Sequence, residues 1–374
     1  MVLPPAVGAT SGGPVDPLFT RFEVAPDLDA ATFTAAATSA GWGDGLPLLV
    51  PHQELVREYV AAADAPAEDV VTILPPRFAP CTVRDVARNA VMTAAPAAAM
   101  PLLCTALRAM TARDFDLMGL SATTEAAVPA LVVNGDIRLR VDVPSGAGCF
   151  GGAVGAGPAI GRALRLVLRN IGGHAEGVSS WSVHGQPGRV TGIVVAEAED
   201  RSPWAPLAAR RGVHGDAVTV FAAQGTIDIV DAGASAAGVL AAIGGSLAVP
   251  ATPPFMTAFS RPEVLVAICP AWAELLAAEV GSIEEVSRRC WDHAVLPVSM
   301  WTDERRARLE EHGRVDDKGM VHVVALPEDL LLVVCGGPGG LYATALHGWG
   351  ATRAITLAIP GTSPGGSADG YRRG

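Results

Sequence analysis

The chain has 374 residues, with 27 Lys or Arg and 38 Asp or Glu, so its formal net charge is −11 at neutral pH. This acidic balance argues against nucleic acid and anionic membranes as partners. The length is sufficient for one large or two ordinary domains with ample cores. The six cysteines form no CxxC pair, and the most hydrophobic stretch (236–249) is short and interrupted by glycines. We therefore expect reduced thiols, no transmembrane helix and a cytoplasmic location.

The two ends of the chain differ from its middle. Residues 1–30 are rich in Pro, Gly, Asp and Ala without periodicity, and residues 361–374 are polar, which predicts a flexible arm and a flexible tail. Between them, predicted strands alternate with predicted helices in an order that occurs once in 31–212 and again in 213–360. The strands are expected at 70–74, 130–133, 192–196, 217–221, 264–268 and 330–334.

This repeated order of elements predicts an α/β fold. We expect two similar α/β halves with mainly parallel sheets, and the repeat suggests an internal pseudo-twofold with the ligand site at the junction of the halves. In parallel sheets of this kind, ligands bind beyond the carboxyl ends of the strands.

The stretch 131–173 combines a predicted strand, a glycine-rich loop and an arginine-bearing helix. Gly146, Gly148 and Gly151 allow a ligand to approach the main chain closely. Arg162, Arg165 and Arg169 follow at spacings of three and four, so they share one side of the helix.

Arginines beside a helix N-terminus are typical of an anion site, and we expect Arg162 to point into a pocket with the backbone of 146–152. The alternative is a solvated arginine face, since the same helix has an apolar side. The glycines also match the letters of a dinucleotide-binding fingerprint. Pro144 and Ser145 separate them from the strand, and no acidic residue ends a second strand near Glu176, so we do not infer a nucleotide site.

Cys149 is the candidate nucleophile or acid. Glycines surround it, and main-chain N–H groups and arginines nearby would favour its thiolate. The alternative is a buried, inert thiol. Cys269 and Cys335 end apolar predicted strands and are most simply core residues. A metal site of these three thiols lacks paired ligand spacing, so we predict no metal and leave the cofactor unknown.

Three polar residues are candidates for binding or proton transfer. Asn134 and Glu197 each follow a predicted strand, and Asn134 is expected to contact the substrate. Glu197 and Glu199 would share a face and raise one another's pKa, as a general acid or base needs, unless they form a solvated acidic turn. His184, in the loop after the arginine helix, is the imidazole most suited to carry a proton.

Several short motifs are spread along residues 41–350. They are Gly41-Trp-Gly-Asp-Gly-Leu-Pro47, Asn89-Ala-Val-Met92, Ala122-Thr-Thr124, Leu131-Val-Val-Asn-Gly135, Ser145-Gly-Ala-Gly-Cys-Phe-Gly151, Ile160-Gly-Arg-Ala163 with Asn170, Gly185-Gln-Pro-Gly188, Ala196-Glu197, Ser202-Pro-Trp204 and Gly336-Gly337. In these motifs the chain resembles an uncharacterised bacterial family with a GW-x-DGLP N-terminal motif, associated with UGSC-type (seleno)proteins. The resemblance implies no particular reaction.

The sequence departs from that family at three places. Ala94-Ala95 stands where relatives have Gly-Cys, Gly155-Ala-Gly-Pro158 replaces an Arg-Ala-Asn-Ala-type stretch, and Ala196-Glu-Ala-Glu-Asp200 replaces Ala-Glu-Asn-Glu-Glu. A thiol and two asparagines of the family are therefore missing. The departures suggest a changed reaction or a loss of catalysis.

Together these features predict an enzyme that acts on a small anionic metabolite, a carboxylate or a phosphate, in specialised metabolism. Cys149 would attack or protonate the substrate and Glu197 or His184 would move the proton, with lyase, transferase and hydrolase chemistry all open. The alternatives are a thiol-based redox protein and a non-catalytic binding or scaffold subunit. A homo-oligomer remains open.

Overall fold

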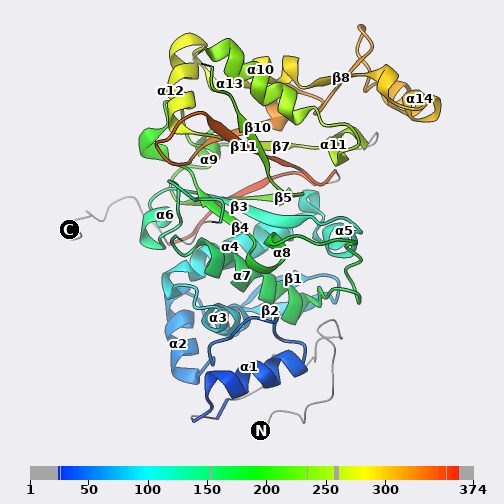
Figure 1. The fold of residues 1–374 in the computed structure, drawn as a ribbon. Coiled ribbons are helices and arrows are strands. Elements are labelled where there is room, and N and C mark those ends of the chain that lie inside the picture. The colour runs from blue at the N-terminus through cyan, green and yellow to red at the C-terminus, as the bar shows by residue number, and fades with distance from the viewer. Residues whose placement is uncertain are drawn as a thin grey trace.

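The computed structural model describes residues 24–25, 27–151, 154–233, 235–256, 261–350 and 352–361. Two four-stranded sheets face each other in the middle of the molecule, and helices cover the outer face of each sheet, which gives four layers (Figure 1). Most of the expected arm (1–30) and tail (361–374), and Gly152 of the glycine loop, lie outside the described residues.

The first sheet has the order β12-β5-β3-β4. Its strands are β3 (Val128–Asn134), β4 (Ile193–Ala196), β5 (Ala217–Ala223) and β12 (Ile355–Ala358). The pair β3–β4 is parallel, and the pairs β3–β5 and β5–β12 are antiparallel. The expected boundary at 212/213 thus precedes a strand, β5, that belongs to the sheet of the first half.

The second sheet has the order β10-β7-β11-β6. Its strands are β6 (Ile227–Val230), β7 (Val264–Ile268), β10 (Leu330–Val334) and β11 (Tyr342–His347). The pair β7–β10 is parallel, and β7–β11 and β11–β6 are antiparallel. The expectation of mainly parallel sheets is therefore wrong, and both sheets are mixed. The connection from β10 to β11 is too short for the crossover that a parallel neighbour requires, so β11 returns antiparallel.

In each sheet, one edge strand directly follows a strand of the other sheet in sequence. β6 follows β5 in sequence but pairs with β11, and β12 follows β11 but pairs with β5. With this exchange, the two sheets have the same strand order and the same strand directions. The strand expected at 70–74 exists as β1 (Val70–Leu74), but it pairs with β2 (Ala79–Thr82) in a separate hairpin.

The central strands are buried on both faces. In β3, Leu131 and Val133 pack against the helices, whereas Ala130 and Val132 face the second sheet. In β7, Val266 faces the other helical layer and Leu265 and Ala267 face the first sheet. Continuous apolar runs such as LVV and VLVAI are what a strand buried on both faces requires.

The helices of the first half lie on the outer side of the first sheet, some in contact with its strands and others packed on those helices (Figure 1). They are α1 (Ala30–Ser39), α2 (Gln53–Ala62), α3 (Val83–Met92), α4 (Met100–Met110), α5 (Leu117–Ala122) and α7 (Gly157–Val167), the last continued by a π-helical turn (Leu168–Gly172), with the short helices α6 (Ile137–Arg140), α8 (Gly188–Thr191) and α9 (Leu207–Arg210) in the connections. Thr82 caps α3 through its side chain, and Asp85 completes a capping box.

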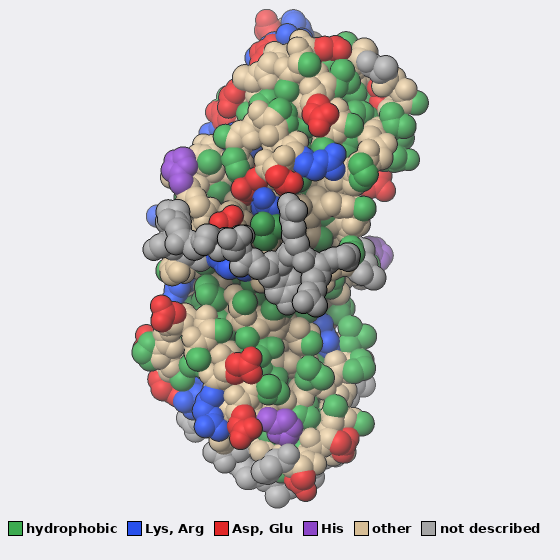
Figure 2. Space-filling view, turned by 90° about the vertical axis from the view of Figure 1, so that its left-hand side faces the viewer, with side chains coloured by type: hydrophobic (Ala, Val, Ile, Leu, Met, Phe, Trp, Pro, Cys, Tyr) green, Lys and Arg blue, Asp and Glu red, His purple; other side chains and the backbone are tan. Residues whose placement is uncertain are grey.

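The second half contributes the opposite helical layer (Figure 1). It consists of α10 (Ala236–Leu247), α11 (Pro253–Met256), α12 (Pro270–Glu279), α13 (Ile283–His293) and α14 (Asp303–Glu311), with a small hairpin of β8 (Val295–Pro297) and β9 (Met320–His322). Within the described ranges, none of these helices has the length and apolar character that crossing a membrane requires. Figure 2 shows acidic, basic and hydrophobic side chains interspersed over one face of the molecule.

Candidate functional site

A pocket lies where the glycine loop of the first half meets the second sheet. Gly336 N donates to Ser145 O at 2.8 Å, and a Cβ on Gly337 would lie 3.0 Å from the Ala147 Cβ, so two glycine-containing loops are in direct contact. The pocket has a volume of about 380 Å³. Its lining includes Gly148, Cys149, Cys269, Cys335, Gly337 and Tyr342.

Three cysteines converge on this pocket. Cys269 follows β7 and Cys335 follows β10, and these parallel strands are neighbours whose last residues, Ile268 and Val334, are paired. Cys149 comes from the glycine loop of the other half. All three thiols are free and the residues are buried. In the part of the chain that the structure describes, no group of three or more His, Cys, Asp or Glu residues is suited to hold a metal ion.

The thiols of Cys149 and Cys335 are joined by a hydrogen bond. This bond is the largest influence on the pKa of Cys149, which is lowered, followed by burial, which opposes the lowering, and by main-chain N–H groups of Cys149 and Phe150. The same bond and burial raise the pKa of Cys335 well above its ordinary value. The lowered pKa favours the thiolate at Cys149, and Cys335 is the neighbouring thiol. The pKa of Cys149 is lowered, as expected from the sequence, but the main cause is the thiol of Cys335 and not the arginines.

The arginines of α7 bind elsewhere, so the prediction that Arg162 enters a pocket with the glycine-loop backbone is wrong. Arg162 Nε donates to Asp44 Oδ2 at 2.6 Å, and Arg169 Nε donates to Gly41 O at 2.8 Å. Arg165 Nε donates to Arg189 O at 2.9 Å. The spacing correctly placed Arg162 and Arg169 on one side, but that side faces the Gly-Trp-Gly-Asp-Gly segment, which supplies its own carboxylate and carbonyl oxygens.

Asn134 and Glu197 meet at the carboxyl ends of β3 and β4. Asn134 Nδ2 donates to Glu197 Oε2 at 2.8 Å and to Glu199 Oε1 at 3.0 Å. Leu207 N donates to Glu197 Oε2 at 2.8 Å. Glu197 is 1% exposed, and burial raises the pKa of its carboxyl group. The pKa is raised by burial and not, as the sequence suggested, by Glu199.

Glu197 occupies the position in the first sheet that Cys335 occupies in the second. Glu197 N donates to Val133 O at 3.2 Å, and Cys335 N donates to Ile268 O at 3.1 Å, so each extends the corresponding parallel ladder by one residue. The ends of the two ladders also touch, since Ala198 N donates to Val334 O at 2.7 Å. The negative charge of Glu197 contributes to the raised pKa of Cys335. Glu197 therefore lies close enough to Cys335 to affect its pKa, but it does not line the pocket.

The histidines lie away from the pocket lining. His184 is exposed in the loop before α8. His347 is buried in β11, where burial lowers its pKa to about 4. His174 is buried beside Arg165, and burial followed by neighbouring arginines lowers its pKa well below the ordinary value. No imidazole is thus among the described residues that line the thiol pocket.

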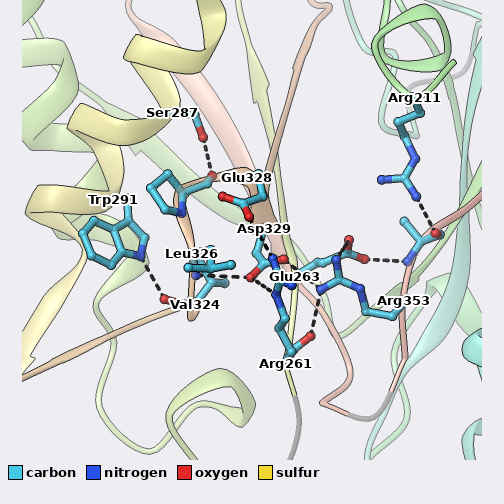
Figure 3. A network of polar contacts seen from close by, with 12 residues as sticks. Arg211, Arg261, Glu263, Ser287, Trp291, Val324, Leu326, Glu328, Asp329 and Arg353 are labelled. Atoms are coloured by element: carbon cyan, nitrogen blue, oxygen red, sulfur yellow. Dashed lines mark hydrogen bonds and ion pairs between the residues drawn. The ribbon is translucent and has the colours of Figure 1, made fainter. Parts of the chain in front are cut away.

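A separate ion-pair network joins the chain before β12 to the second sheet (Figure 3). Arg353 Nη2 lies 3.0 Å from Glu263 Oε1 and its Nη1 donates to Asp329 Oδ1 at 2.8 Å, while Arg261 Nε donates to Asp329 Oδ2 at 2.7 Å. Ala354 N donates to the other Glu263 oxygen. Because each buried charge in this network has an opposite partner, we read it as structural. The sequence patterns did not predict this network, because its bonded residues are 24, 68 and 91 positions apart.

Comparison with known proteins adds no further constraint: no family model, no curated protein and no solved structure matches the chain.

Proposed function

We propose that this protein is an enzyme that uses Cys149 as a reactive thiol on a small molecule held between its two halves. The observation that carries the proposal is that Cys149 and Cys335 meet in a glycine-lined pocket, where their interaction lowers the pKa of Cys149. Thiolates, not thiols, are the nucleophiles of cysteine enzymes, and a neighbouring donor favours the thiolate.

The surroundings of Cys149 and Cys335 support a thiolate at Cys149 and a protonated thiol at Cys335. Glu197 places a carboxylate near Cys335 and contributes to its raised pKa, which keeps the Cys335 proton available for donation. Gly339 lines the pocket and a Cβ there would meet nothing within 4 Å, so its main chain is open to a substrate, and the volume of about 380 Å³ suits a small metabolite. Attack by the Cys149 thiolate would begin a lyase, transferase or hydrolase reaction alike.

We propose no particular charge for the substrate. The expectation of an anionic metabolite rested on Arg162, Arg165 and Arg169, and their contacts remove that support. The cytoplasm remains the proposed location, because free thiols suit a reducing compartment. The UGSC-associated family remains a proposed relationship on the motifs quoted above.

We further propose that the two halves are related by an approximate twofold axis that passes near this junction. The identical strand order of the two sheets supports it, as does the equivalence of Glu197 and Cys335 at the ladder ends. A gene duplication followed by exchange of the last strand would produce this arrangement. The two copies of the strand end have then diverged, one to a carboxylate and one to a thiol.

A second candidate function is thiol-based redox chemistry. Its specific support is that Cys149 and Cys335 are already in hydrogen-bond contact. A hydroperoxide would convert the Cys149 thiolate to a sulfenic acid with release of water or an alcohol. Attack by Cys335 would then form the disulfide and release water.

Alkylation kinetics test the proposal. In the reduced protein at neutral pH, iodoacetamide should modify Cys149 faster than Cys104 or Cys290, because burial raises the pKa of those thiols to about 11 and about 12. Peptide mass spectrometry measures each site. Cys149→Ser should remove the fast phase and Cys104→Ser should keep it. A Cys149 that reacts no faster than Cys104 would contradict both candidate functions.

Treatment with a hydroperoxide then separates the two functions. A Cys149–Cys335 disulfide that a thiol reductant reverses favours the redox function. Stable overoxidation of Cys149 alone, with fast alkylation retained in the reduced protein, favours the nucleophilic enzyme.

A further inference from the structure

A second pocket lies at the junction of the two halves, beside the ion-pair network of Figure 3. Its volume is about 600 Å³, against about 380 Å³ for the thiol pocket, and the two pockets share no lining residue. Both volumes are in the range of small-molecule sites. The first half lines the second pocket with α9 and the residue that follows this helix, and the second half lines it mainly with α13 and β10. The lining includes Leu207, Arg210, Arg211, Ile283, Glu284 and Leu332.

Arg210 is a half-buried guanidinium of this pocket that binds carbonyl oxygens. Its Nε donates to Ala205 O at 3.0 Å, and its Nη2 donates to Leu332 O. Burial lowers the pKa of Arg210, and the charges of Glu197 and Glu284 oppose this lowering without forming an ion pair with it among the described residues. In the same part of the chain no acceptor contacts Arg210 Nη1, so this nitrogen is left for a ligand.

Arg211 is the next residue, and it also binds only neutral oxygens in the described part of the chain. Its Nε donates to Thr356 Oγ1 at 2.8 Å. Its Nη2 donates to Ala354 O at 2.7 Å (Figure 3). Arg353, the third arginine of the lining, differs because it is held by two carboxylates. Arg210 and Arg211 are therefore the two guanidinium groups of the pocket whose charges have no bonded carboxylate.

Two carboxylates line the same pocket, and they differ in the same way. Glu328 lies 3.1 Å from Arg261, so its charge is paired. Glu284 is exposed in the first turn of α13 and has no ion pair within the described ranges. It belongs to the second half, whereas Arg210 and Arg211 belong to the first. The pocket thus presents positive charge from one half and negative charge from the other.

The rest of the lining is apolar, with one further donor on the main chain. Leu207 and Ile283 are buried. β10 is the edge strand of the second sheet, and Leu332 O points away from β7, because it accepts from Arg210. The N–H and C=O of one residue in a strand point to the same side, so Leu332 N–H also points outward, where no further strand pairs with it.

We propose that this pocket binds a small zwitterion with an apolar body, either a free amino acid or a short peptide. The carboxylate of the ligand accepts hydrogen bonds from the Nη1 groups of Arg210 and Arg211. Its ammonium group lies near Glu284, and its side chain contacts Leu207 and Ile283. A ligand with one charge would leave either the arginines or Glu284 without a partner, which is why a zwitterion fits better than a simple anion.

Isothermal titration calorimetry of the full chain tests the ligand class. The probes are leucine and the dipeptide leucyl-leucine, and the controls are isocaproate, which lacks the ammonium group, and isoamylamine, which lacks the carboxylate. At least one zwitterion should bind about tenfold or more tightly than both controls, a difference that one charge-assisted hydrogen bond provides. The better probe distinguishes an amino acid from a peptide. Binding of neither zwitterion, or equal binding of a control, would overturn the proposal.

Two variants test the pocket itself. Arg211→Gln and Glu284→Gln should each weaken binding of the better probe about tenfold or more. Glu274→Gln is the matched control, because Glu274 is exposed on α12 and does not line the pocket, and it should keep the affinity. If Arg211→Gln does not fold, Glu284→Gln remains informative, since Glu284 is on an exposed helix surface. Unchanged affinity in Glu284→Gln would contradict the ammonium site. Fast alkylation of Cys149 should persist in all variants, which separates this site from the thiol chemistry.

Discussion

Arg162 binds both carboxylate oxygens of Asp44, with Nε 2.6 Å from Oδ2 and Nη2 2.8 Å from Oδ1. Both side chains are 13% exposed, so the pair is largely shielded from water. The same guanidinium donates to Pro47 O at 3.0 Å. Arg162 therefore holds the Gly-Trp-Gly-Asp-Gly-Leu-Pro segment against α7, and its role in the structure is to position that segment.

This pair should contribute measurably to stability. Arg162→Met or Asp44→Asn alone should lower the free energy of unfolding by about 3 kcal/mol, because each leaves a shielded group without its partner. The double variant should lose less than the sum of the single losses. Urea denaturation of the four proteins measures the coupling. Additive losses would show that the two groups do not interact in solution.

Cys335 should control the reactivity of Cys149. In Cys335→Ala the hydrogen bond is lost while the burial of Cys149 remains, so the pKa of Cys149 should rise and its alkylation at neutral pH should slow. Cys335→Ser keeps an O–H donor and should restore part of the rate. The measurement is the pH dependence of the Cys149 alkylation rate. Identical profiles for wild type and Cys335→Ala would rule out this positioning role.

His347 should make the folded state sensitive to acid. Burial lowers its pKa from the ordinary 6.5 to about 4 in the folded protein. The unfolded chain therefore binds the proton first as the pH falls, and the stability that the neutral ring contributes is fully present above pH 6.5 and decreases down to about pH 4. The total loss is about 3 kcal/mol.

The comparison with His347→Gln isolates this effect from the buried carboxyl groups, whose raised pKa values act in the opposite direction. Urea titrations at several pH values between 4 and 7 measure it. The free-energy difference between wild type and the variant should shrink or reverse as the pH falls. A difference that stays constant across this range would be inconsistent with a buried neutral His347.

Two adjacent glycines in α10 should respond to alanine in opposite ways. A Cβ on Gly244 would lie 2.4 Å from Cys290 O, whereas a Cβ on Gly245 would meet nothing within 4 Å. Gly244→Ala should therefore separate α10 from α13 and lower stability by about 1–3 kcal/mol. Gly245→Ala should raise it by about 0.5–1 kcal/mol, because alanine loses less backbone entropy in a helix. Thermal or urea unfolding of the two variants checks this, and equal effects would contradict the close packing of these helices.

The positions of the central strands follow from local sequence patterns. The runs at 130–133, 264–268 and 330–334 form β3, β7 and β10, because a strand buried on both faces needs continuous apolar residues. The sequence also placed Asn134 and Glu197 at the carboxyl ends of strands, but that these strands are parallel neighbours is known only from the structure. These are consequences of local periodicity and of the residues at strand ends.

Strand direction and the partners of the site residues depend on how the whole chain packs. The spacing of Arg162 and Arg169 shows that they share a side of α7, but what that side faces depends on a contact across 118 residues, which periodicity does not encode. Likewise, the sequence does not distinguish Cys335 from other small residues at the end of an apolar strand. Its role follows from the contact with Cys149, which comes from a loop of the other half. The thiol pair exists because two sheets with separate local patterns pack face to face, and that packing is set by the whole chain.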